Sequence, residues 1–181
     1  MAGFEYRGQL NGAENPVVLD VVIANSSTVK VGDMLNLEAF SSGGGVQRVA
    51  ATEKVLGVCI GIVNKDGIDL DNADVASYDG TWTTSTKTYV ASADNKTDKL
   101  VKAMLIVDTF SLFYNDSAGT LAAADELKYF DVADQDQVAD QDGHDTAGAL
   151  QLIKRDPDGD GDASKGIFRM VETELFPFAQ R

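Results

Sequence analysis

Four aspartates form the one motif in the sequence with the spacing of metal ligands: Asp156, Asp158, Asp160 and Asp162. Aspartates two positions apart in a tight loop can turn their carboxylates toward one centre, and calcium prefers such oxygen ligands. A helix-flanked calcium loop that began at Asp156 would need a glutamate where this sequence has Ile167. The motif is therefore either a weak, partly hydrated calcium site or a solvated turn, and its composition favours the turn.

The residues on both sides of this motif predict strands. Leu150–Arg155 is an apolar run, and Ile167–Thr173 alternates in character after the turn. On a pleated chain Phe168 and Met170 point to one face, and Ile167 and Arg169 point to the other. We expect a β-hairpin in which the four aspartates occupy the tip.

The other residues that could take part in catalysis or metal binding do not form a catalytic group. His144 is the only histidine and lies in a polar loop without a serine nucleophile nearby. Cys59 is the only cysteine and sits in an apolar run, so neither a disulfide nor a thiolate zinc site is expected. The aspartate-rich segment 131–145 is a weaker candidate for binding a cation. We expect a protein that is not an enzyme.

The charge of the chain limits its partners. The 181 residues carry a formal net charge of −14, and the pI is near 4.2. A surface this acidic repels phosphates, so neither nucleic acid nor an anionic membrane is an expected partner. Residues 1–7 lack a hydrophobic segment of signal-peptide length, and we expect a protein that is made and kept in a cytosol.

Most of the chain predicts short strands separated by turns. Segments with the apolar content of strands occur throughout: Val17–Ala24, Met34–Phe40, Val46–Ala50, Val55–Val63, Leu100–Val107 and Phe110–Tyr114. Glycines within Val55–Val63 indicate a close backbone approach or a bend. Only residues 120–130 have the composition of a short helix. The pattern predicts an all-β fold, an antiparallel β-barrel or sandwich of about nine to eleven short strands.

The ends of the predicted domain are less regular. Residues 1–15 are polar and rich in glycine, and they form either a frayed terminus or an N-terminal arm that orders on a partner through Phe4, Tyr6 and Arg7. Residues 16–181 form the predicted single β-barrel domain. Residues 71–98 form a threonine-rich excursion from it, with three aromatic side chains: Tyr78, Trp82 and Tyr89. These rings either pack the excursion onto the barrel, which is the favoured interpretation, or form a surface patch.

Several segments resemble the small β-rich decoration proteins, also called head-stabilising or cementing proteins, of tailed bacteriophages. They are a strand that follows a turn glycine (Val29–Leu35), a central glycine-containing strand (Val55–Ile62), Ala118–Leu121 with Asp125–Asp134, and the late hairpin with Phe168–Val171. The excursion at 71–98 is longer than in the smallest members of that family. The similarity therefore concerns the order of features along residues 17–174.

This resemblance implies a structural protein of the virion that is made in the host cytoplasm and binds the exterior of the capsid. The implied partner is the major capsid protein, and the implied assembly is a homotrimer on the capsid. Removal of residues 1–15 is then expected to weaken capsid binding and to leave the fold intact. Two alternatives remain open: a calcium-dependent carbohydrate-binding β-sandwich that uses Trp82, Tyr78 or Tyr89, and a phage tail-tube or head-completion protein.

Overall fold

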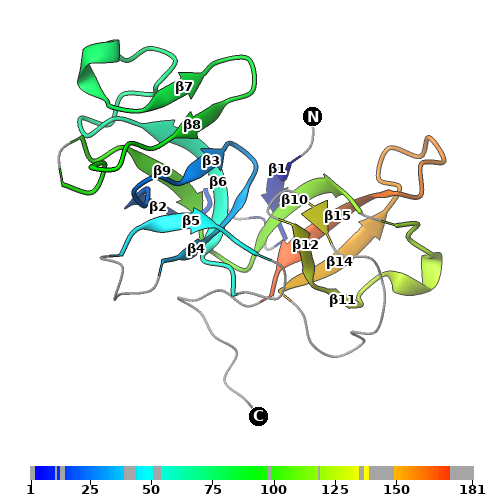
Figure 1. The fold of residues 1–181 in the computed structure, drawn as a ribbon. Helices are drawn as coiled ribbons and strands as arrows, with labels where there is room; N and C mark the ends of the chain where they lie inside the picture. Colours follow the sequence, from blue (N-terminus) through cyan, green and yellow to red (C-terminus); the bar gives the residue numbers. More distant parts are fainter. Residues whose placement is uncertain are drawn as a thin grey trace.

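The strands of this protein are short and pair in antiparallel order (Figure 1). The computed structural model describes residues 3–10, 12, 15–38, 44–50, 54–97, 99–117, 119–134, 137–138 and 149–171. Within these residues there are fifteen strands and two 3-10 turns. The prediction of a mainly antiparallel β-fold is confirmed. The strands are more numerous than predicted because several of them contain only two or three residues.

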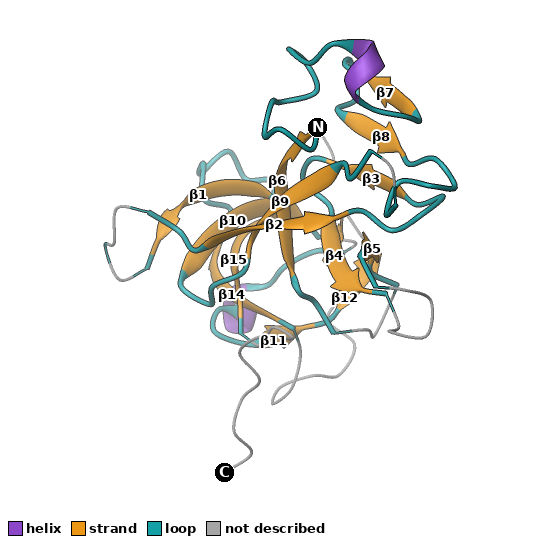
Figure 2. Cartoon of the chain, turned by 90° about the vertical axis from the view of Figure 1, so that its left-hand side faces the viewer, coloured by secondary structure: helices purple, strands orange, loops and turns teal. Residues whose placement is uncertain are grey.

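Three sheets contain all but one pair of these strands. Sheet A has the spatial order β1 (Glu5–Gln9), β10 (Ser111–Asp116), β15 (Lys165–Met170), β14 (Leu150–Arg155) and β11 (Tyr129–Phe130) (Figure 2). Sheet B has the order β2 (Val18–Val22), β9 (Lys102–Ile106), β6 (Gly57–Val63), β4 (Met34–Leu37) and β5 (Val46–Arg48). Sheet C consists of β3 (Thr28–Lys30), β8 (Thr88–Val90) and β7 (Thr81–Thr83). A separate hairpin pairs β12 (Val132–Asp134) with β13 (Gln137–Val138).

Sheet B is central because side chains on both of its faces are buried. Val58 and Ile106 join a core cluster with Phe113 of sheet A. The neighbouring Cys59 and Leu105 join a second cluster, which includes Tyr89 of sheet C. Successive residues of a strand point to opposite faces. The continuous apolar run in β6 is therefore the sequence of a strand that is covered on both sides.

Sheet B also curls until its two edge strands meet. The end of β2 forms a parallel bridge with β5 through Ile23 and Val46, and the Ala24 amide donates to the Val46 carbonyl at 2.8 Å. Gly45 lies against this contact, and a Cβ at its position would lie 3.0 Å from the Ala24 Cα. Closure into a barrel-like form is thus limited to sheet B, whereas sheet A keeps two separate edges, β1 and β11.

A β-bulge in β6 shapes the surface between the sheets. The register between β6 and β9 shifts between Cys59 and Gly61, so Ile60 has no direct partner in β9. Ile60 is partly exposed, unlike its neighbours in the strand. The predicted close approach at a glycine of this strand is confirmed at Gly57, where a Cβ would lie 2.4 Å from the Ile106 carbonyl oxygen.

Two expectations about local structure are wrong. Residues 120–130 do not form a helix, because only Ala123–Asp125 make a single 3-10 turn and Tyr129–Phe130 belong to sheet A. Leu127 explains why: its side chain is 64% exposed, its φ is 71°, and its amide bonds to the Leu152 carbonyl of β14. In a helix with a buried apolar stripe, a leucine of that stripe would be buried and its φ would be negative.

The second wrong expectation concerns the N-terminal arm. Glu5–Gln9 form β1, which pairs with β10 as the edge strand of sheet A. By contrast, the late hairpin follows the prediction closely, since β14 has the predicted bounds and Phe168 and Met170 are buried while Ile167 and Arg169 are partly exposed. Within the described ranges, no helix has the length and apolar character needed to cross a membrane.

Candidate partner-binding site at the first strand

Strand β1 is fixed to the rest of the protein by Phe4. This side chain is 4% exposed and packs edge-on against Phe113 with a ring separation of 6.4 Å. The Phe4 amide donates to the Gly32 carbonyl at 2.8 Å. Phe4, which was predicted to contact a partner, is therefore a core residue and is not available as a surface anchor.

Two glycines allow the start of β1 to approach the turn between β3 and β4. Gly3 and Gly32 have φ values of 133° and 97°, which residues with a Cβ rarely adopt. A Cβ at Gly32 would lie 3.2 Å from the Gly3 Cα. The two backbones are thus in direct contact, and this contact joins sheet A to sheet B.

Tyr6 and Arg7 reach the surface on opposite sides of β1. Tyr6 packs edge-on against Phe113 at 6.2 Å and remains partly exposed. Arg7 lies at a β-bulge, where the register with β10 shifts between Tyr6 and Gly8. Its guanidinium lies 4.9 Å from the centre of the Tyr114 ring and pairs with Glu5 at 3.2 Å. Of the three predicted partner-binding residues, the structure leaves Tyr6 and Arg7 accessible.

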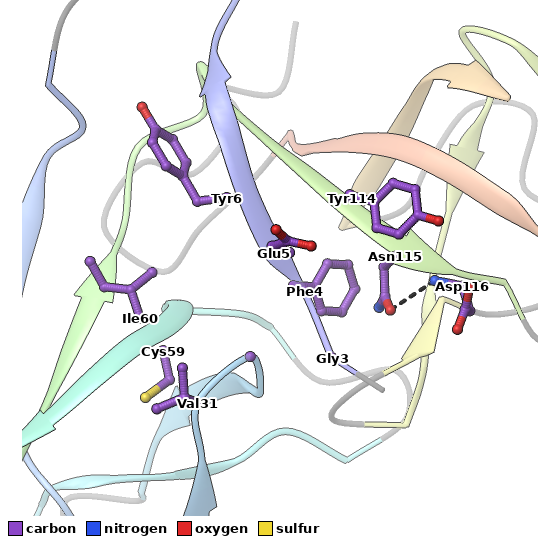
Figure 3. Close-up of a pocket in the computed structure, with 11 residues that line it drawn as sticks. Gly3, Phe4, Glu5, Tyr6, Val31, Cys59, Ile60, Tyr114, Asn115 and Asp116 are labelled. Carbon is purple, nitrogen blue, oxygen red and sulfur yellow. Dashed lines mark hydrogen bonds between the residues drawn. The ribbon is translucent and has the colours of Figure 1, made fainter. Parts of the chain in front are cut away.

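A hollow of about 490 Å³ lies between β1 and the bulge of β6 (Figure 3). Its walls come from β1, β10, β6 and the turn before β4: Gly3, Phe4, Glu5, Tyr6, Val31, Gly32, Cys59, Ile60, Tyr114, Asn115 and Asp116. Figure 3 shows Ile60, Cys59 and Val31 on one side and Tyr114 and Asp116 on the other, with β1 between them. Mostly apolar walls with a few polar groups are typical of a binding hollow.

The ionisable groups of the hollow are poor candidates for catalysis. Burial raises the pKa of the Cys59 thiol well above its ordinary value, so the thiol stays protonated at neutral pH. Burial also raises the pKa of Tyr114, and the nearby Asp158 carboxylate adds to this effect. Glu5 and Asp116 are the carboxylates of the lining. These groups suit the binding of an apolar side chain beside a cation better than a proton-transfer reaction.

An ion pair between the buried Asp33 carboxylate and the partly exposed Arg48 guanidinium holds the turn that carries Gly32. Asp33 is fully buried and accepts hydrogen bonds from the Lys30 amide at 2.7 Å and from Arg48 Nε at 2.7 Å. It thereby ties the turn between β3 and β4 to β5. The sequence predicts a turn glycine in this segment but not the pair between Asp33 and Arg48, because the spacing of fifteen residues carries no local signal.

Asp108 fixes the other end of β1. Its carboxylate accepts hydrogen bonds from the Phe110 amide at 2.9 Å, the Ser111 amide at 2.7 Å, the Val17 amide at 2.8 Å and the Gln9 side chain at 3.3 Å. Asp108 is 6% exposed, and such a buried carboxylate needs several donors. This residue was also missed, since one aspartate after an apolar run is an ordinary turn signal.

The four aspartates of the late hairpin do not converge on one centre. In the part of the chain that the structure describes, no group of three or more His, Cys, Asp or Glu side chains is placed to hold a metal ion. Asp156 instead accepts from the amides of Asp160 and Gly161 at 3.2 and 3.1 Å. Lys165 pairs with Asp160 at 3.2 Å and with Asp162 at 3.1 Å. An ammonium group thus lies beside two of the carboxylates proposed as calcium ligands, and Asp158 lies apart, close to Tyr114.

The Asp162 contacts give the loop a measurable titration. Hydrogen bonds from the Ser164 hydroxyl and amide, followed by the contact with Lys165, lower the pKa of Asp162 from 3.8 to about 2. We expect Ser164→Ala to raise this pKa toward 3.8, because it removes the largest of these stabilising contacts. A carboxylate titration followed by NMR measures the change, with Ser117→Ala as the control. An unchanged pKa in Ser164→Ala would contradict the assignment.

The same shift fixes the sign of a pH effect. The folded-state pKa lies below the ordinary value, so the Asp162 contacts stabilise the protein above pH 3.8 and are lost as the pH falls through about 2. The loop is exposed, and the effect on stability is small.

The aromatic residues of the excursion mainly pack it onto the protein. Tyr89 is fully buried, its hydroxyl donates to the Asp79 carbonyl, and Tyr78 packs edge-on against it at 6.3 Å. Trp82 is partly buried, and its indole nitrogen donates to Asp71 at 3.0 Å. The favoured interpretation of these rings is confirmed, and Tyr78 and Trp82, which are partly buried, keep some surface that a ligand could touch.

Other candidates lie wholly or partly outside the described residues. His144 falls there, as does most of the aspartate-rich segment 131–145. Comparisons with known proteins found no matching family model, no matching curated protein and no matching solved structure.

Proposed function

We propose that this protein is a capsid decoration protein of a tailed bacteriophage, which binds the exterior of the capsid and stabilises it by bridging coat subunits. The proposal rests on the resemblance of several segments to that family and on the mainly antiparallel β-fold. The acidic composition suits a protein that meets other proteins rather than nucleic acid.

The observation that carries the proposal is the position of β1. This strand is at an edge of sheet A, borders the hollow of about 490 Å³, and presents Tyr6 and Arg7 to a partner. Tyrosine and arginine are the residue types enriched at the centres of protein interfaces. An edge strand beside an apolar hollow can receive an extended segment of another chain.

Bridging explains how such contacts would stabilise a capsid. A shell under internal pressure fails where neighbouring coat subunits separate. A trimer that binds three subunits adds contact free energy across each seam, and the linked contacts raise the total affinity far above that of one contact. Neither catalysis nor a cofactor is needed for this role.

The proposal predicts that Arg7→Ala weakens binding to expanded phage heads roughly fivefold, since it removes one partly desolvated cation from the interface. The measurement is cosedimentation with expanded heads of the phage that encodes this chain, at several protein concentrations. Lys154→Ala is the matched control, because Lys154 is an exposed cation of sheet A on β14, away from the β1 edge. Equal binding by both variants would contradict the role of β1.

A further inference from the structure

A second hollow, of about 140 Å³, has Val31 and Ile60 in common with the hollow beside β1. Its lining is Val31, Ile60, Gly61, Ile62, Asp69, Asp71, Trp82 and Lys87. Because the bulged residue Ile60 lines both hollows, we group them as one surface that includes Asp116 of β10 and Asp69 near the excursion. We call this surface the β6 groove.

The middle of the β6 groove is apolar. Ile60 is partly exposed because the bulge removes it from the regular pairing of β6 with β9. Val31 lies beside it, and Tyr6 and Phe4 close the side nearest β1. Exposed aliphatic and aromatic surface in a concave site favours burial of apolar side chains from a ligand.

Each hollow of the β6 groove carries one carboxylate without an ion-pair partner among the described residues: Asp116 in the hollow beside β1 and Asp69 in the second hollow. The other two carboxylates are already paired, Glu5 with Arg7 and Asp71 with Lys87. The lining therefore leaves two negative charges uncompensated, separated by an apolar middle. A complementary ligand has cations at its ends and apolar groups between them.

We propose that the β6 groove binds an extended protein segment with a basic residue at each end and apolar residues between them. In an extended chain, alternate side chains point to one face. Such a segment can therefore place its two basic side chains and the apolar side chains between them in the groove. This inference rests on the proposed function in one respect: it identifies the bound segment as part of the coat protein. Nucleic acid does not fit, because its phosphates would meet Asp116 and Asp69.

The sequence provides its own reporter for this site. Trp82 is the only tryptophan and lines the groove, so occupancy changes its fluorescence. The probe is the peptide Arg-Thr-Val-Thr-Phe-Thr-Arg with blocked ends, in which the arginine and apolar side chains share one face. We expect a saturable change in Trp82 emission. The same peptide with glutamate in place of both arginines should bind at least tenfold more weakly, since attraction becomes repulsion.

Substitutions test each part of the groove. Asp69→Lys and Asp116→Lys should each weaken binding of the basic peptide about fivefold, and Ile60→Ser should weaken it without changing its salt dependence. Asp20→Lys is the control, because it makes the same charge change at an exposed position of β2. Thermal melts of all variants verify that they are folded.

Three results would overturn the inference: no response to the basic peptide, equal binding of the basic and acidic peptides, or a Trp82 response to neutral oligosaccharides in place of the peptide. The last result would favour a carbohydrate ligand. The inference and the proposed function fail separately. If Asp69→Lys and Asp116→Lys bind heads normally, only the groove is excluded. If the protein binds the basic peptide but does not bind expanded heads, only the capsid role is excluded.

Discussion

Replacing Phe4 with alanine should lower the free energy of unfolding by about 3 kcal/mol, the loss typical of truncating a buried phenylalanine. Phe4 is 4% exposed and contacts Phe113, so its removal leaves a cavity between sheet A and sheet B. Urea denaturation measures the effect. Leu10→Ala is the control, because Leu10 lies just after the same strand but is 51% exposed, and surface truncations change stability little.

This prediction reverses the expected outcome of an N-terminal deletion. If residues 1–15 were an arm outside the fold, their removal would affect capsid binding alone. Because β1 pairs with β10 and Phe4 is in the core, the deletion should destabilise sheet A as well. A truncated protein as stable as the intact one would contradict the placement of β1. If truncation abolishes binding to heads, the loss can result from lower stability or from a lost contact. The Arg7→Ala variant distinguishes the two.

Replacing Asp33 with alanine should cost about 2 kcal/mol of stability, since it removes a buried carboxylate that accepts from the Lys30 amide and from the partly exposed Arg48 guanidinium. The Lys30 amide and the Arg48 guanidinium both lose their acceptor. The turn that holds Gly32 against Gly3 would then loosen, and the hollow beside β1 would lose one wall. Urea denaturation again gives the measurement.

Asp33→Asn is the matched comparison for this variant. The asparagine keeps one acceptor oxygen for the Lys30 amide, but it removes the charge and replaces the second oxygen, which accepts from Arg48, with an NH2 group. It should therefore cost less than Asp33→Ala, which removes both acceptors. Equal stability of Asp33→Ala and the unmodified protein would show that the pair with Arg48 is not needed for the fold.

The fold was predictable where side-chain periodicity is strong. The alternation in β15 and the apolar runs of β6 and β10 are local patterns, and each of them correctly predicted a strand. The wrong predictions have a common cause: where the local pattern is weak, long-range contacts determine the secondary structure. Leu127 exposes its side chain because its backbone pairs with β14, and a polar, glycine-rich N-terminus becomes a strand because β10 offers it an edge.

The candidate site was only partly predictable for the same reason. Tyr6 and Arg7 were identified from their residue types. The groove depends on Ile60, whose exposure results from a register shift, and on Asp69 and Asp116, which lie far apart in the sequence and line hollows that have Ile60 in common. No local sequence pattern predicts that these three residues line one surface.

If the protein stabilises a capsid by bridging its subunits, as we propose, it should delay the heat-induced release of DNA from expanded heads. Heads that lack a decoration protein are warmed with and without this protein, and DNA release is followed with a dye. We predict that saturating protein raises the temperature of release, and that Arg7→Ala requires a higher concentration for the same effect. Release at the same temperature with and without saturating protein would contradict the claim.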